Sequence, residues 1–503
     1  MTKGAMPVLV GVGQVTDHWD GTQGPEGAPS PKRLCVRASE IALADAGIAA
    51  SHINMLAVVR IFEDSVPGDR HPHGHNTNLP GTIARDLDAT PDHAIYAAVG
   101  GQSPQQLANE LAARIFAGEI DCALVTGSEA NKASKAARKH GVEIDWADGD
   151  DLDVEDRGMG DMLLSRAEIK HGIIAPAYFY ALFENAMAAR AGQTRSERRA
   201  AMSDLFAKFA AIAAGHPHAQ FDTSTFDAAF LATPSKANYP FADPFLKWHI
   251  AQDAVNQGAA FVMMSEDKAN ALGIAETKRL YLHGSGEASD DFISVRPRLD
   301  GSWAMKIAIE RALAQADLTA DEIGAFDLYS CFPCAVFSAM AELGIDHKTE
   351  TRPLTVTGGL PFFGGPGNNY SMHGLVSMTE WLRAKAGSYG LVLANGGWMT
   401  KEAVGIWSTE RPESFAPIAP MAKPPAKVTL MEAPSAGTIE TYTVTYGRDG
   451  PSGGIIFARS ETGERFIAIA APEAMPRLLE EESPIGLRIT VTTENERNTF
   501  QFA

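Results

Sequence analysis

The segment 96–119 (YAAVGGQSPQQLANELAARIFAGE) leads from an apolar strand into a helix through two adjacent glycines. Turns of this kind present a nucleophile in many enzymes, because the helix N-terminus directs free N–H groups and a positive dipole end at the site. Gly100 and Gly101 carry no reactive atom, and we expect the Ser103 hydroxyl to be the helix N-cap, with Gln106 at N3 completing a capping box. The turn therefore has the form of a nucleophile elbow and lacks a nucleophile.

A pair of cysteines marks a second predicted strand-to-helix turn, at Cys331 and Cys334 after the strand AFDLYS. A cysteine at a helix N-terminus has a lowered pKa and more thiolate. The pattern is compatible with a nucleophile at Cys331, with a redox dithiol, or with two small apolar side chains buried beside a sheet. Zinc binding would need a second pair of ligands, which the sequence does not offer.

Two polar segments contain residue types that bind metals. The segment HPHGHNTN (71–78) has three histidines but lacks carboxylate or cysteine companions at ligand spacing, and we interpret it as a surface loop. The acidic run DWADGDDLDVEDR (145–157) lacks the position-specific pattern of a calcium loop and is typical of a solvated loop. The sequence therefore predicts no metal site.

Composition narrows the classes of partner. The 503 residues are too many for one ordinary core, and 45% apolar with 21% charged residues are typical of globular proteins. The formal net charge of −19 disfavours nucleic acids and anionic membranes as partners, since both need basic surfaces, but allows a phosphorylated small molecule. The four cysteines, the lack of a signal-peptide pattern and the lack of any run of about 18 apolar residues lead us to expect a cytoplasmic protein.

The sequence contains an internal repeat. Four pairs of segments align in the same order at lags of 258 to 273 residues: 9–13 with 282–286, 42–59 with 312–329, 99–101 with 357–359, and 117–130 with 386–399. Each half alternates short apolar strands with amphipathic helices, which predicts parallel sheets covered by helices. We therefore expect a duplicated α/β fold.

Three further stretches have no counterpart in this repeat. The segment 131–250 contains apolar helices, and we expect an inserted helical domain that roofs a site. The segment 411–425 is proline-rich and is typical of a linker. About five short alternating strands follow within 426–503 and predict a small β-barrel or sandwich.

Taken together, these features resemble the thiolase superfamily over residues 1–410. The resemblance rests on the duplication, the paired strand-to-helix turns, the inserted helices, the strand GAAFVMM within 253–274, and the glycine-rich segments GGP at 364–366 and NGG at 395–397. It implies an α/β protein with two βαβαβαββ halves in α-β-α-β-α layers. The implied halves are 1–130 with 251–275, and 276–410.

The C-terminal strands resemble the OB-fold domain of small proteins that accompany thiolase-like subunits, some of which cleave aldol adducts of steroid side-chain CoA esters. The segments that carry this resemblance are GTIETYTVTY and GGIIFARSETGERFIAIA, within 426–503. Those partner proteins usually add a zinc ribbon with four cysteines, which this segment lacks. The expected C-terminal domain is thus an OB-like barrel alone.

The residues on which thiolase chemistry depends are replaced. Thiolases carry an acylated cysteine on the first elbow, a histidine that activates it, a second cysteine that acts as acid and base, and a further polar motif. The corresponding positions here are Gly101, Gly365, Asn395 and the pair Ser330-Cys331. Because a cysteine–histidine pair works as a unit, we do not expect acyl transfer through an acyl-cysteine.

The resemblance leaves binding of an acyl-CoA thioester as the expected function. We expect the ligand to reach the elbow, where helix N–H groups and two asparagine side chains offer donors to the thioester oxygen. The expected ligand-contacting residues are Gly100, Gly101, Gln102, Ser103, Asn368 and Asn395. Coenzyme A is expected as part of the bound thioester ligand, and no covalently bound cofactor is expected.

Two other functions remain open. An aldol-type lyase acting on β-hydroxyacyl-CoA esters would need a general base, for which His373, Tyr329 and Tyr370 are candidates. Separately, Cys331 is a candidate for a relocated nucleophile. His373 equally fits a histidine packed in the core. A non-catalytic scaffold subunit is the third possibility. The resemblance also implies a homodimer.

Overall fold

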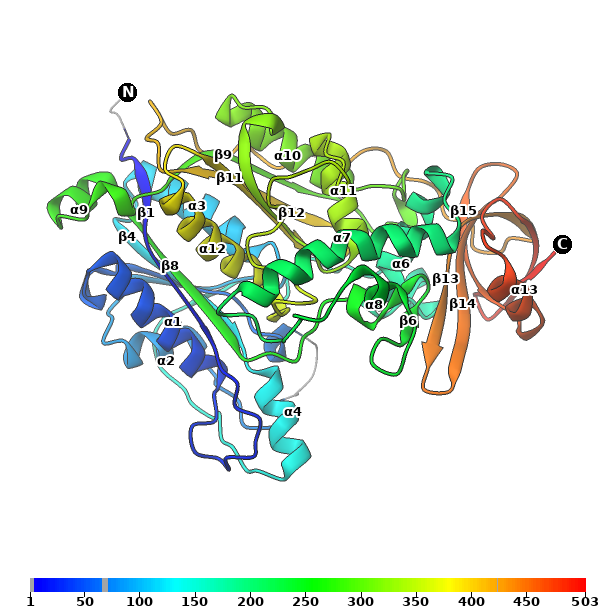
Figure 1. Cartoon of the computed structure of the whole chain (residues 1–503), viewed down its shortest axis with the longest axis horizontal. Helices are drawn as coiled ribbons and strands as arrows, with labels where there is room; N and C mark the ends of the chain where they lie inside the picture. The colour runs from blue at the N-terminus through cyan, green and yellow to red at the C-terminus, as the bar shows by residue number, and fades with distance from the viewer. Residues whose placement is uncertain (1–3, 66–70, 423) are drawn as a thin grey trace.

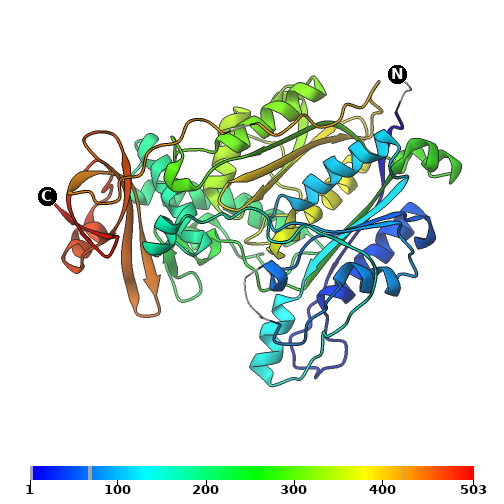
Figure 2. The same cartoon turned by 180° about the vertical axis from the view of Figure 1, so that it is seen from behind.

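The computed structural model describes residues 4–65, 71–422 and 424–503. It contains two α/β halves, a helical insertion in the first half and a small barrel at the C-terminus (Figure 1). The barrel lies at one end of the molecule beside much of the insertion, and both views show the first half toward the other end (Figures 1 and 2). Among the described helices, none is both long and apolar enough to cross a lipid bilayer.

Both halves follow one order of strands and helices. The first half contains β1 (Pro7–Thr16), α1 (Pro31–Ala46), β2 (Met55–Val58), α2 (Leu79–Asp86), β3 (His93–Tyr96), α3 (Ser103–Ala117), β4 (Cys122–Glu129) and β8 (Gln257–Ser265). The second half contains β9 (Tyr281–Ser289), α10 (Trp303–Ala316), β10 (Ile323–Leu328), α11 (Pro333–Leu343), α12 (Tyr370–Ala384), β11 (Tyr389–Gly396) and β12 (Lys401–Ser408). In place of a strand matching β3, the second half has an irregular segment whose Pro353 carbonyl oxygen accepts from Phe326 N at 2.8 Å.

The two sheets have matching strand orders. The first is β1-β8-β4-β2-β3, extended by the short strand β5 (Glu155–Asp156), and the second is β9-β12-β11-β10. The predicted duplication is confirmed. The strands that helices connect pair in parallel, as expected, whereas β8 and β12 run antiparallel to their neighbours. The expectation of parallel sheets is corrected for these two strands, and for β12 the reason is that the turn between β11 and β12 is too short for a crossover connection.

One pair of segments in the predicted repeat is misaligned. Because α3 begins at Ser103 and α12 at Tyr370, the counterpart of the turn 100–102 is the 3-10 helix η7 (Gly367–Asn369), not 357–359. The glycines at 357–359 belong to the irregular segment before that helix. Short glycine matches do not fix an alignment when loop lengths differ between the halves.

Helices α3 and α12 lie between the two sheets, and α1, α2, α10 and α11 cover the outer faces (Figure 1). The central core joins both inner helices to alternate residues of both sheets: Leu107, Leu111, Ile115, Met372, Leu375, Val376, Leu9, Ala57, Val125, Ala325 and Val392. The intervening strand residues belong to the two outer cores, as the period of two along a strand requires. The α-β-α-β-α layering that the resemblance to the thiolase superfamily implied is confirmed.

The insertion lies between β4 and β8. Its described elements are α4 (Asn131–His140), β5, α5 (Arg166–Lys170), α6 (Pro176–Arg190), α7 (Arg195–Gly215), α8 (Ala228–Ala232), β6 (Pro240–Ala242) and β7 (Phe245–Leu246). The longest helix, α7, begins in a capping box in which Glu197 N donates to Thr194 Oγ1 at 3.2 Å. Phe179, Phe183 and Phe206 bury the inner faces of α6 and α7 against the second half.

Five strands near the C-terminus close into a barrel. They are β13 (Ala436–Gly447), β14 (Gly450–Arg459), β15 (Arg465–Ala470), β16 (Arg488–Glu494) and β17 (Arg497–Phe502), with α13 (Met475–Glu480) before β16. The pairing order is β13-β14-β15-β17-β16, and β16 returns to β13. The strand-rich C-terminal domain predicted from the sequence is confirmed.

The barrel is anchored to both the insertion and the second half. Strand β13 pairs with β6, and Asn185 Nδ2 on α6 donates to the Tyr442 carbonyl oxygen at 2.8 Å. The buried Arg465 guanidinium donates to the Glu440 carboxylate at 2.7 Å and to the Ser294 carbonyl oxygen at 3.0 Å. The C-terminal domain is therefore packed against the rest of the chain instead of being carried on a free tether.

Candidate functional site

The elbow before α3 has a different cap from the predicted one. Ser103 is the first helical residue, and its hydroxyl donates to the Ala98 carbonyl oxygen at 2.8 Å. Gln102 occupies the N-cap position, and its side chain makes no capping hydrogen bond. The predicted capping box of Ser103 with Gln106 is therefore wrong, because the tight turn brings the Ala98 carbonyl within reach of the hydroxyl.

The space beside Gly101 is filled by the second half of the fold. A Cβ atom built on Gly101 would lie 2.4 Å from the Tyr329 hydroxyl oxygen and 2.5 Å from the Asn395 carbonyl oxygen. Tyr329 directly follows β10, and Asn395 lies near the end of β11. Since one of the two obstructing atoms belongs to the backbone, a cysteine at position 101 would require the chain around it to move.

The Gln102 side chain occupies the room that the neighbouring glycines leave. Its Oε1 atom lies 2.0 Å from a Cβ atom built on Gly100 and 1.9 Å from one built on Gly396. Gln102 is 4% exposed, and its Oε1 has no hydrogen-bond partner among the described residues. The expectation that Gly100 and Gly101 leave space for a ligand is therefore corrected: the glycines permit close packing of the Gln102 amide and the Tyr329 hydroxyl.

Cys331 is buried at the second strand-to-helix turn, before α11. Burial raises the pKa of its thiol to about 12, although a hydrogen bond with Tyr180 opposes the shift. Cys334 is engaged elsewhere, because its thiol donates to the Tyr180 carbonyl oxygen at 3.4 Å. All four cysteines of the chain are free thiols. A buried, protonated thiol favours the packing role of this pair over the nucleophilic and redox hypotheses.

The insertion contributes a tyrosine to the cluster around Asn395. Asn395 Nδ2 donates to the Tyr180 hydroxyl at 3.0 Å and to Cys331 Sγ at 3.7 Å. The Tyr180 hydroxyl in turn donates to the Gly397 carbonyl oxygen at 2.9 Å. Asn395 Oδ1 has no hydrogen-bond partner among the described residues. Asn395 thus lies beside the elbow with its donor engaged and its acceptor free.

Glu402 is a buried carboxyl group that sequence reasoning missed. It lies on β12 opposite Asn395 and is 2% exposed, and neither carboxyl oxygen has a hydrogen-bond partner within the described chain. Burial raises the pKa of Glu402 well above its usual range, and the Arg296 guanidinium opposes the shift. The charge of Glu402 in turn contributes to the raised pKa of both Tyr180 and Tyr329, which places it at the same cluster. The available signal was a lone acidic residue in the apolar strand KEAVGIWS.

His373 is buried on α12 and faces β1. Its Nδ1 atom lies 3.0 Å from Gln14 Oε1, and its Nε2 atom has no hydrogen-bond partner in the described part of the chain. Burial lowers the pKa of His373 well below its usual range, and His218 and His216 add to the effect. A neutral imidazole held between α12 and β1 fits the core interpretation better than a base at the elbow.

Two other predicted residues are already engaged in hydrogen bonds. Asn368 Nδ2 donates to the Arg60 carbonyl oxygen at 2.7 Å and to Ser65 Oγ at 3.0 Å. The Tyr370 hydroxyl lies 2.6 Å from Thr357 Oγ1 in the core. These bonds leave Asn368 without a spare donor for a thioester, and they make Tyr370 a packing residue.

Gly365 and Ser330, which stand at the positions of the thiolase histidine and polar motif, make hydrogen bonds with neighbouring backbone groups. Gly365 N donates to the Gln252 carbonyl oxygen at 2.8 Å, and a Cβ atom built on Gly365 would lie 3.5 Å from Ala251 Cβ. Ser330 Oγ accepts from Leu360 N at 3.2 Å. Because position 365 has far more room than position 101, the fold excludes a side chain at the nucleophile position more strongly than at the histidine position.

Residues 158–164 of the insertion cover the elbow, and we call them the roof segment. A Cβ atom built on Gly160 would lie 3.3 Å from Lys401 Nζ and 3.6 Å from Ala98 Cβ. Lys401 Nζ also donates to the Val99 carbonyl oxygen at 3.4 Å, so the roof segment, β12 and the elbow meet there.

The roof segment carries exposed apolar side chains. Met159 is 44% exposed and Met162 is 75% exposed. Leu163 of the same segment packs against the turn after β11, since its Cδ1 atom lies 3.0 Å from a Cβ atom built on Gly397. Exposed methionines beside a covered turn are typical of a surface that adapts to an apolar ligand.

Comparisons with known proteins agree with this architecture. A family profile described as "Thiolase-like protein type 1 additional C-terminal domain" matches residues 419–496. A comparison with curated proteins gives no match. Among solved structures, the chain is similar to a monomeric SCP2-thiolase-like protein type 1 from Mycobacterium smegmatis, with a TM-score of 0.82, 36% identity and coverage of 99% of each chain.

Two more distant structures share the fold. The Ltp2-ChsH2(DUF35) aldolase has a TM-score of 0.61 at 16% identity, covering 82% of this chain and 99% of that one. An acetyl-CoA acetyltransferase from Syntrophomonas wolfei has a TM-score of 0.54 at 16% identity, covering 81% of this chain and 100% of that one. Identities this low show the fold alone. The 36% identity over almost the whole length shows more: the chain belongs to the SCP2-thiolase-like proteins of type 1, within the thiolase superfamily.

Proposed function

We propose that this chain binds a CoA thioester beneath the roof segment and does not transfer the acyl group through a cysteine. The observation that carries the proposal is the filled position at Gly101. Glycine carries no sulfur atom for acylation, and the Tyr329 hydroxyl and the Asn395 carbonyl fill the space that a cysteine side chain would need. The Cys331 thiol does not replace it, because burial raises its pKa to about 12.

Unused apolar and polar groups around the elbow support the binding part of the proposal. Met159 and Met162 offer exposed apolar surface to an acyl chain. Trp398 Nε1 and Asn395 Oδ1 are buried polar atoms without hydrogen-bond partners among the described residues, and both flank the turn after β11. Buried polar atoms of this kind are costly unless a ligand or water satisfies them.

A second candidate function is aldol-type cleavage of a β-hydroxyacyl-CoA ester. Glu402 favours it, because a buried carboxyl group with a raised pKa is suited to act as a general acid or base. His373 lies beside Gln14 and Tyr370 beside Thr357, away from the elbow, whereas Glu402 lies opposite Asn395. Glu402 therefore joins Tyr329, which lies beside Gly101, as a candidate base.

Isothermal titration calorimetry with a medium-chain acyl-CoA tests the binding proposal. We expect saturable 1:1 binding, and a Met162→Asp variant that binds at least tenfold more weakly because a carboxylate repels an apolar chain. The matched control is Ile41→Asp, which replaces an exposed apolar residue (45%) on α1, at the opposite face of the first sheet. Equal affinity of Met162→Asp and the unaltered protein would contradict the proposed location of the binding site beneath the roof segment. If no acyl-CoA binds at all, the non-catalytic scaffold subunit is the function that remains.

Turnover assays then separate the two candidate functions. We expect no thiolysis of acetoacetyl-CoA by free CoA. Binding of a β-hydroxyacyl-CoA without release of an aldehyde or ketone supports the first function. Carbonyl release that the Glu402→Gln variant abolishes supports the second.

We infer that the chain is monomeric, in place of the homodimer that the resemblance implied. The edge strand β3 is covered by β5 of the same chain, with Ile95 opposite Glu155 and Tyr96 opposite Asp156. A covered edge that carries acidic side chains does not take up a strand from a second chain. The relative from Mycobacterium smegmatis is described as monomeric.

A further inference from the structure

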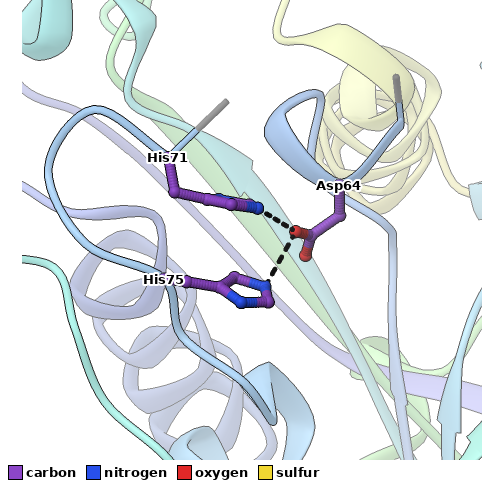
Figure 3. A group of neighbouring side chains, drawn as sticks. All are labelled: Asp64, His71 and His75. Atoms are coloured by element: carbon purple, nitrogen blue, oxygen red, sulfur yellow. Dashed lines mark ion pairs between the residues drawn. The ribbon is translucent and has the colours of Figure 1, made fainter. Parts of the chain in front are cut away.

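Three side chains of metal-binding type meet in the first half, apart from the elbow cluster. Asp64 belongs to the short 3-10 helix η2 (Glu63–Ser65), and His71 and His75 lie in the loop that leads to α2 (Figure 3). One ligating atom from each residue lies within 4.8 Å of the other two. The interpretation of 71–78 as a loop without a carboxylate companion overlooked Asp64. That residue precedes the loop in the sequence, and the fold places its carboxylate beside His71 and His75.

The donor atoms have the spacing of ligands around one ion. Asp64 Oδ1 lies 3.6 Å from His71 Nε2 and 3.4 Å from His75 Nε2. Bonds of about 2.0–2.1 Å to a tetrahedral zinc ion separate neighbouring ligand atoms by roughly 3.3–3.4 Å. Both imidazole nitrogens face the same carboxyl oxygen (Figure 3), and because the two rings stack they must turn apart for both nitrogens to reach one ion.

Further groups hold the three side chains in place. The second carboxyl oxygen of Asp64 accepts from the Tyr96 hydroxyl. The imidazole rings of His71 and His75 stack with centroids 3.9 Å apart. Glu63 Oε2 lies 3.8 Å from His71 Nδ1, the nitrogen on the far side of that ring. A carboxylate behind an imidazole commonly supports a metal-bound histidine through a hydrogen bond, and Glu63 would have to move closer to His71 to make one.

We propose that Asp64, His71 and His75 bind a divalent transition-metal ion of the zinc type. Two imidazoles and one carboxylate suit zinc, iron or cobalt, whereas magnesium and calcium prefer oxygen ligands throughout. Three protein ligands leave a coordination position for water or a small ligand. A cavity of about 20 Å³ beside the two histidines, lined in part by His71, His75 and Asn76, has room for one water molecule.

The metal site adjoins the segments that meet at the junction of the two halves. Ser65, next to Asp64, accepts through its hydroxyl from Asn368 Nδ2 of η7 at 3.0 Å. Phe62 N donates to Glu129 Oε1 of β4 at 2.8 Å. An ion bound to Asp64 therefore fixes η2 and the histidine loop against η7, which precedes α12 and the elbow cluster.

The third histidine of the loop provides a matched control. His73 Nε2 lies 3.1 Å from Ser134 Oγ on α4, and its ring packs edge-on against Trp146 at 4.9 Å between centroids. It therefore faces away from the three proposed ligands while sharing their loop.

Titration of chelator-stripped protein with ZnCl₂, and separately with CoCl₂, tests the proposal. We expect one ion per chain, a rise in the melting temperature with zinc, and visible d–d absorption with cobalt. Asp64→Asn and His75→Ala should each weaken zinc binding by more than about a hundredfold and remove the cobalt bands. His73→Ala should bind zinc as the unaltered protein does.

The outcomes are decisive because two variants probe the site independently, and melting without metal shows whether each is folded. No saturable zinc or cobalt binding would overturn the proposal and leave the cluster as ion pairs between histidine and aspartate. Binding that survives in both Asp64→Asn and His75→Ala, or that His73→Ala removes to the same extent, would also overturn it. The elbow cluster plays no part in these readouts, so they stand apart from tests of thioester binding.

Discussion

A single methyl group at position 101 tests whether the elbow is packed shut. In the Gly101→Ala variant, the new Cβ atom would lie 2.4 Å from the Tyr329 hydroxyl oxygen and 2.5 Å from the Asn395 carbonyl oxygen. An ordinary carbon–oxygen contact needs about 3.5 Å, so each neighbour must retreat by about 1 Å. The Tyr329 ring is buried and the Asn395 carbonyl belongs to β11, so neither moves freely.

Overpacking of this kind costs about 1–3 kcal/mol of unfolding free energy. For a domain of 150–250 residues, each kcal/mol shifts the melting temperature by about 2–4 °C, so we expect Gly101→Ala to melt at least about 2 °C lower. Differential scanning calorimetry measures the shift. The control is Gly215→Ala at the end of α7, where a built Cβ atom meets no described heavy atom within 4 Å. We expect this control to be neutral or slightly stabilising.

A second substitution identifies the obstructing group. Tyr329→Phe removes the hydroxyl oxygen at 2.4 Å and leaves the Asn395 carbonyl oxygen at 2.5 Å and the ring carbon Cζ of residue 329 at 2.9 Å. Gly101→Ala should therefore cost less in the Tyr329→Phe background than alone, with a coupling that a double-mutant cycle detects. If Gly101→Ala melts like the unaltered protein, position 101 has room for a side chain, and the reasoning for a closed elbow fails.

Three further predictions follow from buried charges and from the covered sheet edge. Burial raises the pKa of Glu402 above its unfolded value, so the stabilising contribution of this group is full below pH 4.5 and is lost as the pH rises through the folded pKa. The Glu402→Gln variant should therefore gain stability relative to the unaltered protein between pH 5 and pH 8. A difference in melting temperature that does not depend on pH would contradict this prediction. Arg465→Ala should lose at least about 1–3 kcal/mol in urea unfolding, because the carbonyl oxygens of Ser294 and Arg296 lose a buried donor, although Glu440 keeps its pair with Arg459. Arg488→Ala, whose partner Glu461 is also exposed, should lose less than about 1 kcal/mol, and equal losses would refute the anchoring role. Light scattering should give the monomer mass of 53.7 kDa, and a stable dimer mass would show that β5 does not block the edge.

Local patterns predicted the large features of the fold. The alternation of short apolar strands and helices, with the repeated segments, indicated the duplicated layers, and the run of alternating strands after 426 indicated a strand-rich C-terminal domain. Both signals depend on periodicity along the chain, which burial on one face of a strand or helix imposes. The assignment of Gly101 to the nucleophile position came from the resemblance to thiolases and stays a prediction.

The side chains that fill the space around the elbow could not be predicted from local sequence patterns. Tyr329 and Asn395 reach Gly101 from the second half, and Tyr180 reaches Asn395 from the insertion. Asp64 likewise meets the histidine loop only through the fold. Such contacts depend on how distant elements pack, and no spacing within one segment encodes them. The same limit explains why empty space was expected beside glycines that are in fact tightly packed.

The most direct test of the central claim is intact-protein mass spectrometry after incubation with acetyl-CoA or acetoacetyl-CoA. A thiolase accumulates an acyl group on its elbow cysteine, whereas this chain has Gly101 at that position and a buried thiol at Cys331. We predict that the protein keeps its unmodified mass. An acyl adduct that forms stoichiometrically in the folded protein, and that Cys331→Ala removes, would contradict the account.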